Sequence, residues 1–210
     1  MKLKKITAAI AAAALMLSAT ACSNSGAASD TAPAADDSAS ADGKVYNIGI
    51  VQLVQHDALD AATQGFQDIL KEKLGDNVQF EFQNANGEST NCTTIATGFV
   101  ASNVDLIMAN ATAALQASAA ATSTIPILGT SVTDYATALE IDDWTGVTGR
   151  NISGTSDLAP IDEQEKMLVE MFPEVKQVGI IYCSAEANSK YQATLFGEAL
   201  SADGIAYKEY

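Results

Sequence analysis

From residue 44 onward, short apolar runs alternate with longer stretches in which apolar residues recur at helical spacing. Strands are predicted at residues 45–54, 78–83, 104–109, 125–130 and 175–182. Their nearly continuous apolar character is typical of strands buried on both faces of a parallel sheet. Helices are predicted between and after them, at residues 57–74, 90–102, 112–123, 161–172 and 187–202. This alternation predicts an α/β fold with parallel sheets flanked by helices.

An internal similarity refines this picture. Residues 49–70 align without gaps over residues 179–200, which places Phe66 on Phe196 and His56 on Glu186. Chance matching of two strand–helix units explains part of this similarity. The similarity nevertheless favours two similar lobes. We therefore predict an N-terminal α/β lobe at residues 44–152 and a partial C-terminal α/β lobe at residues 153–210, in which residues 205–207 form a second strand.

The first residues have the pattern of a secretory signal. Three lysines precede an apolar run at residues 6–17, and small residues then lead to Cys22. The run is too short for a transmembrane helix, which needs about 20 apolar residues, so residues 1–21 are predicted to be a signal peptide. The stretch "ATAC" resembles the bacterial lipobox, although Ala19 stands where leucine is more common. That resemblance implies that Cys22 is lipidated and anchors an extracytoplasmic protein to the bacterial cell membrane.

Composition restricts the linker and the partners. Residues 23–43 contain no Ile, Leu, Val or aromatic residue, so residues 22–43 are predicted to form a lipid-anchored disordered linker. The formal net charge is −15, which argues against nucleic acid as a partner because phosphates are bound through Lys and Arg. The remaining cysteines, Cys92 and Cys183, are predicted to be free and mostly buried, with a disulfide between them as the alternative.

Polar clusters follow the predicted strands at residues 55–57, 110–112, 130–134 and 184–189. In open parallel sheets, ligands bind beyond the carboxyl ends of the strands, where the chain enters the next helix. These clusters therefore predict a shared site for a polar ligand. Simple N-capping of the helices is the alternative for each residue taken singly.

Several stretches together resemble one family. "IGIVQLVQHDALDAATQGF", "FQNANGE", "VDLIMANAT", "SVTD", "NISGTSDLAPI" and "GIIYCSAEANS" are similar to ABC-transporter substrate-binding proteins of the tryptophan/tyrosine-permease type, with the type I periplasmic-binding-protein fold. The resemblance implies a two-lobed receptor that closes on a small-molecule solute and delivers it to an ABC permease and its ATPase. It also implies a longer full-length protein, so the chain is expected to be truncated at its C-terminus.

By matching position, the resemblance implies a set of ligand-binding residues in the cleft between the lobes. Some members of the family bind aromatic amino acids. An Asp or Glu would pair with the ammonium group of such a ligand, and hydroxyl groups and helix N-termini would bind its carboxylate. Tyr135 departs from the family, which usually has proline there, and Trp144 lies in an altered stretch where it packs a loop or reaches the cleft rim. The implied residues are Gln55, His56, Leu59, Thr112, Ala113, Thr133, Asp134, Asp157, Glu186, Asn188 and Ser189.

Catalytic motifs are weak by comparison. His56 with Asp57 and Asp60 offers a base and its orienting groups, but the sequence contains no G-x-S-x-G, HExxH, CxxC or Walker-type motif. We therefore predict no enzyme, no metal and no cofactor. The alternatives to transport are a ligand-sensing module that reports to a membrane receptor and an exported α/β enzyme. Neighbouring genes for a permease and an ATPase would favour transport over sensing, and a ligand recovered unchanged would exclude the enzyme.

Overall fold

The computed structural model describes residues 43–210, so the predictions for the signal peptide, Cys22 and the linker lie outside the described residues. The first sheet is entirely parallel, with strand order β2-β1-β3-β4-β5. All its strands therefore present their carboxyl ends at one edge. The strands are β1 (Tyr46–Gln52), β2 (Val78–Asn84), β3 (Leu106–Asn110), β4 (Ile127–Val132) and β5 (Ile152–Ser156).

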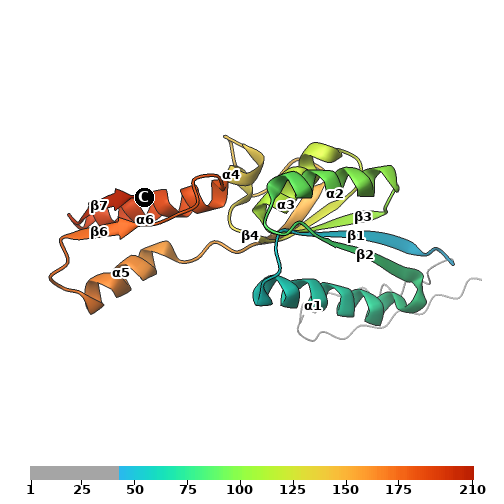
Figure 1. The fold of residues 1–210 in the computed structure, drawn as a ribbon, viewed down its shortest axis with the longest axis horizontal. Helices are drawn as coiled ribbons and strands as arrows, with labels where there is room; N and C mark the ends of the chain where they lie inside the picture. Colours follow the sequence, from blue (N-terminus) through green and yellow to red (C-terminus); the bar gives the residue numbers. More distant parts are fainter. Residues whose placement is uncertain (1–42) are drawn as a thin grey trace, which may run out of the picture. The chain divides into compact units, whose positions relative to one another are not determined.

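Helices cover both faces of this sheet. α1 (Asp57–Leu74) lies on one face, whereas α2 (Ser89–Ala101) and α3 (Thr112–Ala121) lie on the other (Figure 1). A short helix, α4 (Tyr135–Leu139), follows β4, and a 3-10 turn, η1 (Gly75–Asn77), links α1 to β2. The layered arrangement buries the central strands β1 and β3 on both sides, whereas the edge strands β2 and β5 stay partly exposed.

The core forms separately on the two faces. On the α2 and α3 face, Phe99 is fully buried over β1, and a β-carbon at Gly49 would lie 2.6 Å from its ring. Glycine at that position lets the ring lie directly on the strand. On the α1 face, Ile50 and Met108 belong to a smaller cluster that Phe66 of α1 covers. The Phe66 and Phe80 rings meet edge to face, with centroids 6.4 Å apart.

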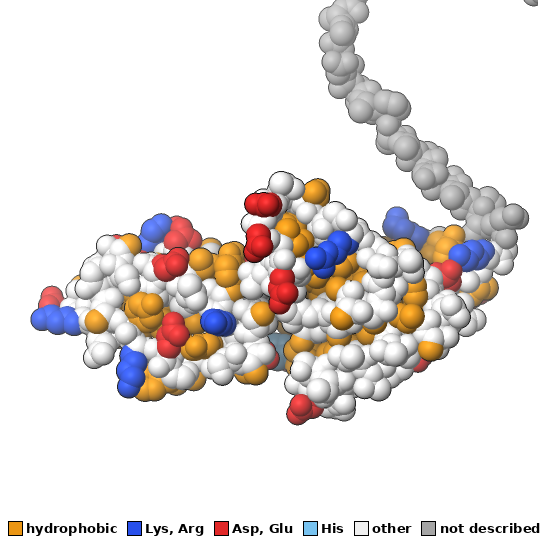
Figure 2. Space-filling view, turned by 90° about the horizontal axis from the view of Figure 1, so that it is seen from above, with side chains coloured by type: hydrophobic (Ala, Val, Ile, Leu, Met, Phe, Trp, Pro, Cys, Tyr) orange, Lys and Arg blue, Asp and Glu red, His pale blue; other side chains and the backbone are white. Residues whose placement is uncertain are grey.

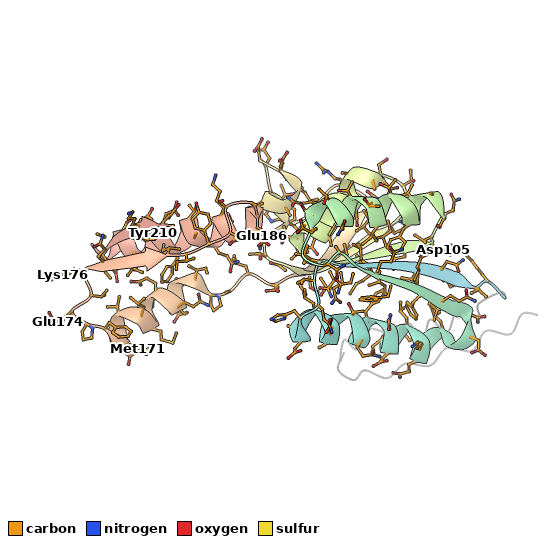
Figure 3. The ribbon with its side chains drawn as sticks, viewed as in Figure 1. Asp105, Met171, Glu174, Lys176, Glu186 and Tyr210 are labelled. Atoms are coloured by element: carbon orange, nitrogen blue, oxygen red, sulfur yellow. The ribbon has the colours of Figure 1, made fainter. Side chains whose placement is uncertain are left out.

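An ion pair marks the amino end of the sheet. Lys44 Nζ lies 2.6 Å from Asp105 Oδ1, and the Asn47 backbone N–H donates to Asp105 Oδ2 at 2.9 Å. Asp105 stands just before β3, near the start of β1 (Figure 3). The Lys44 ammonium first, and the Asn47 N–H second, lower the pKa of the Asp105 carboxyl, while Asp105 raises the pKa of Lys44.

The second sheet contains two parallel strands, β6 (Gln177–Ile180) and β7 (Ala206–Glu209), with α5 (Ile161–Met171) and α6 (Ala187–Ala202). Leu200 of α6 is fully buried. α1 and α6 both begin directly after the two residues that the internal similarity aligns, so His56 and Glu186 hold the same N-cap position. The two strand–helix units therefore correspond at their helix starts, whereas the division into two similar lobes stays a prediction.

The predicted α/β fold with parallel sheets and flanking helices is confirmed. β5 and α4 were not predicted as elements. The prediction for the cysteines was right about the absence of a disulfide, but only Cys92 is buried and Cys183 is exposed. Cys183 follows the short strand β6 in a turn, where no helix covers it, whereas Cys92 lies in the α2 core and burial raises the pKa of its thiol.

Acidic, basic and apolar side chains are interspersed on the surface that Figure 2 presents. Trp144 lies in the loop before β5 and is 40% exposed, so only part of its ring packs on the protein. Among residues 43–210, no helix is both long enough and apolar enough to span a bilayer.

Candidate functional site

The carboxyl edge of the first sheet brings together the predicted residues of the N-terminal lobe and also Asp157, which was predicted in the C-terminal lobe but follows β5 of this sheet. Each follows the end of a strand, and the strands are adjacent and parallel. Sequence positions up to about a hundred residues apart thus reach one edge. They are Gln55, His56, Leu59, Thr112, Ala113, Thr133, Asp134 and Asp157.

The turn after β1 is exposed at Gln55 and His56. His56 Nδ1 accepts a hydrogen bond from the Ala58 N–H at 3.2 Å and so caps α1. The N-capping alternative therefore applies to this histidine. Leu59 acts through its backbone, because its carbonyl accepts a hydrogen bond from Asn110 Nδ2 at 2.8 Å.

The turn after β3 is the most unusual part of this edge. Ala111 has φ 100° and ψ 160°, a conformation that side chains rarely adopt and that costs about 1 to 3 kcal/mol. No side chain caps α3, which begins at the next residue. Thr112 is 5% exposed, and its Oγ1 is buried without a hydrogen-bond partner. The first turn of α3 therefore offers uncapped N–H groups beside an unpaired hydroxyl.

The turn after β4 is held by local hydrogen bonds. Asp134 Oδ1 accepts from the Thr137 N–H at 2.7 Å and caps α4, so one carboxylate oxygen already has a partner. Thr133 is buried, and its carbonyl accepts from Ser156 Oγ at 2.9 Å. Asp157 is exposed just beyond β5, with its N–H bonded to the Val132 carbonyl at 2.9 Å.

The remaining predicted residues follow β6 of the second sheet. Glu186 occupies the N-cap position of α6 but makes no side-chain capping bond, so its carboxylate is not used by the helix (Figure 3). Ser189 Oγ accepts from the Cys183 N–H at 3.0 Å, and the Asn188 carbonyl accepts from Gln192 Nε2 at 3.4 Å. It stays a prediction that Glu186, Asn188 and Ser189 share one site with the residues at the edge of the first sheet.

Sequence reasoning missed the polar side chains beneath the edge. Gln52 and Asn110 are the last residues of β1 and β3, and both are completely buried. They are hydrogen-bonded to Asp60 and Thr63 of α1. A polar amide at the last position of an otherwise apolar strand was the available signal, because buried amides need partners.

The chemistry of this edge suits a zwitterion. The amino end of α3 and the Thr112 hydroxyl are suited to a carboxylate, since helix N-termini attract anions. Asp134, Asp157 and Glu186 are suited to an ammonium group. Within residues 43–210, no group of three or more His, Cys, Asp or Glu side chains is arranged to hold a metal ion. A cavity of about 440 Å³ lies beside β5, between Tyr135 and Trp144.

Comparison with known proteins gives concordant matches. Residues 47–210 match the family of ABC transporter substrate binding proteins. A tyrosine-binding protein of Clostridioides difficile is 40% identical over 196 residues, which are 91% of this chain and 55% of that protein. The chain thus spans little more than half the length of this relative.

Solved structures agree. A conserved domain protein from Vibrio cholerae superposes with a TM-score of 0.74 at 35% identity, over 80% of this chain and 57% of that one. The ABC domain of Streptococcus pneumonia in complex with L-Trp gives a TM-score of 0.73 at 32% identity, with the same coverage. The fold is that of the type I periplasmic-binding proteins, and the chain belongs to the family of ABC transporter substrate-binding proteins.

Proposed function

We propose that this chain is the solute-binding component of an ABC importer and that it captures an aromatic amino acid. Two relatives support the class of solute: the one from C. difficile is called tyrosine-binding, and the one from S. pneumonia was solved with L-Trp. The proposed contacts are the predicted residues of both sheets, which would meet in a cleft between the lobes.

The observation that carries the proposal is the amino end of α3. It combines an uncapped first turn with the buried, unpaired Thr112 hydroxyl. A buried hydroxyl without a partner is unfavourable by about 1 to 3 kcal/mol, which a bound carboxylate would recover. Asp134 and Glu186 would then receive the ammonium group of the same solute.

The proposal includes the place of action. The resemblance of "ATAC" to a lipobox supports a lipid anchor at Cys22 and therefore an extracytoplasmic protein held at the bacterial membrane. Its partners would be the permease and the ATPase of the importer. Binding and release leave the solute chemically unchanged, so no catalytic residue is proposed.

The test is to identify the solute. Small molecules that co-purify with the protein are released and analysed by mass spectrometry, and calorimetry then measures binding of L-tyrosine, L-tryptophan and L-phenylalanine. L-leucine and L-glutamate serve as controls without an aromatic ring. We expect an aromatic amino acid in the extract and the tightest binding for it. Recovery of an unrelated solute that binds, with no response to the aromatic amino acids, would contradict the proposal.

A further inference from the structure

A buried polar network connects the ends of β1 and β3 with α1. Gln52 Nε2 donates to Asp60 Oδ1 at 2.5 Å and to the Val54 carbonyl at 2.9 Å. Thr63 Oγ1 donates to Gln52 Oε1 at 2.7 Å. Asn110 Nδ2 donates to Thr63 Oγ1 at 2.9 Å. Gln52 and Asn110 are paired across the two strands, so the network ties the first two turns of α1 to the carboxyl edge.

The network fixes the orientation of both amide groups. Because the Asp60 carboxylate only accepts at this contact, Gln52 must direct its Nε2 there and its Oε1 toward Thr63. The Thr63 hydroxyl gives its proton to Gln52 and accepts from Asn110. A flipped Asn110 would place its oxygen against the Leu59 carbonyl, which cannot donate. Asn110 Oδ1 is therefore left buried without a partner.

The next residue is the strained Ala111. Its N–H donates to the Thr130 carbonyl at 3.0 Å, and its carbonyl accepts from the Leu115 N–H at 3.0 Å. The Asn110 carbonyl accepts from the Leu53 N–H at 3.2 Å. Such a backbone conformation persists only where the surroundings determine it from several sides. The Asn110 side chain supplies one of those constraints through the network.

We propose that Gln52, Asp60, Thr63 and Asn110 are positioning residues that hold Ala111 in its strained conformation. They thereby place the amino end of α3, with the Thr112 hydroxyl, for ligand binding. Gln52, Thr63 and Asn110 are buried, so they act on the amino end of α3 without touching the ligand themselves. The role in binding rests on the proposed function, whereas the effect on Ala111 is a property of the free protein.

The test compares Thr63→Val with Thr63→Ser. Valine keeps the shape and removes the hydroxyl, while serine keeps the hydroxyl. In the ligand-free protein, NMR should show shifted backbone amide resonances of Ala111, Thr112 and Ala113 in the valine variant and little change in the serine variant. Calorimetry with L-tyrosine and L-tryptophan, well below the melting temperature of each variant, should show about a tenfold or larger loss of affinity for valine only.

A second substitution separates positioning from general stability. Ala111→Gly removes the strain, because glycine adopts φ near 100° readily, so it should recover most of the binding lost in Thr63→Val. Unchanged Ala111–Ala113 resonances in Thr63→Val, or a loss of affinity that Ala111→Gly leaves as it was, would overturn the proposal. If the wild-type protein binds none of the three aromatic amino acids, the proposed function fails, and the NMR comparison still decides whether the network positions Ala111.

Discussion

The hydroxyl of Tyr135 occupies the space that a β-carbon on Gly154 would need. Gly129, on the neighbouring strand, lies against the same phenol: its β-carbon would come within 3.2 Å of Tyr135 Cζ. Tyr135 is 6% exposed, and its hydroxyl has no hydrogen-bond partner. Two strands without side chains at these positions thus make room for the tyrosine ring.

Gly154→Ala should destabilise the protein by about 1 to 3 kcal/mol, because the new methyl group would collide with the Tyr135 hydroxyl and the Gly129 carbonyl. Thermal and urea unfolding measure the effect. Gly98→Ala is the matched control: Gly98 lies in α2 with nothing near its missing β-carbon, so alanine there should stabilise by up to about 1 kcal/mol. A Gly154→Ala protein that unfolds like the wild type would show that the phenol is free to move.

Tyr135→Phe should leave stability at pH 7 unchanged or raise it, because the lost hydroxyl makes no hydrogen bond. Burial raises the pKa of Tyr135 to about 12. The folded state therefore holds this proton more tightly than the unfolded chain, whose tyrosine pKa is near 10. The contribution of the neutral Tyr135 to the free energy of unfolding is complete below pH 10. It is lost as the pH rises to 12, which lowers the free energy of unfolding by about 2 to 3 kcal/mol.

Urea unfolding at pH 9 and at the highest pH the protein tolerates would measure this difference. The phenylalanine variant should lose less stability than the wild type over that interval. Parallel curves for the two proteins would mean that Tyr135 ionises without opposition in the folded state.

Asp105→Asn should lower stability at pH 7, because it removes the negative charge of the carboxylate. That carboxylate pairs with the Lys44 ammonium and accepts a hydrogen bond from the Asn47 N–H. The folded-state pKa of Asp105 lies below its usual 3.8, so the carboxylate stabilises the folded protein above that value. The contribution is lost as the pH falls through the lowered pKa. Melting curves of the two proteins should therefore converge in acid. Glu163→Gln is the control, since its ion pair with Lys166 is exposed and should have no measurable effect.

Asp134→Asn and Glu186→Gln should weaken binding of an aromatic amino acid by about 2 to 5 kcal/mol, if each carboxylate pairs with the buried ammonium. Asparagine keeps an oxygen that can cap α4, so the fold is retained while the charge is lost. Glu186 makes no capping bond, so its replacement tests charge alone. Calorimetry measures both. Wild-type affinity in both variants would place the ammonium elsewhere.

Cys22→Ala should release the protein from the membrane fraction, because it removes the predicted site of lipidation. Fractionation with immunoblotting measures the distribution, and mass spectrometry detects the acyl chains. Cys183→Ala is the control, since that thiol lies in the folded region and should not affect anchoring. Equal membrane retention of the Cys22 variant would rule out the anchor.

Helices were predicted more accurately than strands, for a physical reason. The bounds of α1 and α6 agree with the predicted ranges, because their apolar residues recur at helical spacing between polar helix starts. β5 was missed because an edge strand needs one buried face only, and after the buried Ile152 its residues 153–156 are polar or glycine. Backbone pairing with β4 determines this strand, and no periodicity of side chains reports such pairing.

The candidate site was predicted in outline only. Polar residues after apolar strands predicted that these side chains gather at one edge of the sheet, since the carboxyl ends of parallel strands must meet there; that this edge binds the ligand stays a prediction. The strained backbone of Ala111 could not be predicted, because nothing in an alanine signals a positive φ. Nor could the capping roles of His56 and Asp134 be separated from ligand binding, since both uses favour the same side chains.

The exposure of Cys183 has a practical consequence. Within the described residues it is the only exposed thiol, because Cys92 is buried in the α2 core. In a chain that begins after Cys22, a maleimide dye would therefore react at a single place, in the turn that leads to Glu186 and Ser189. A dye at this place would report on the turn during the proposed solute capture, so the sequence already contains the attachment point for a fluorescent test of that proposal.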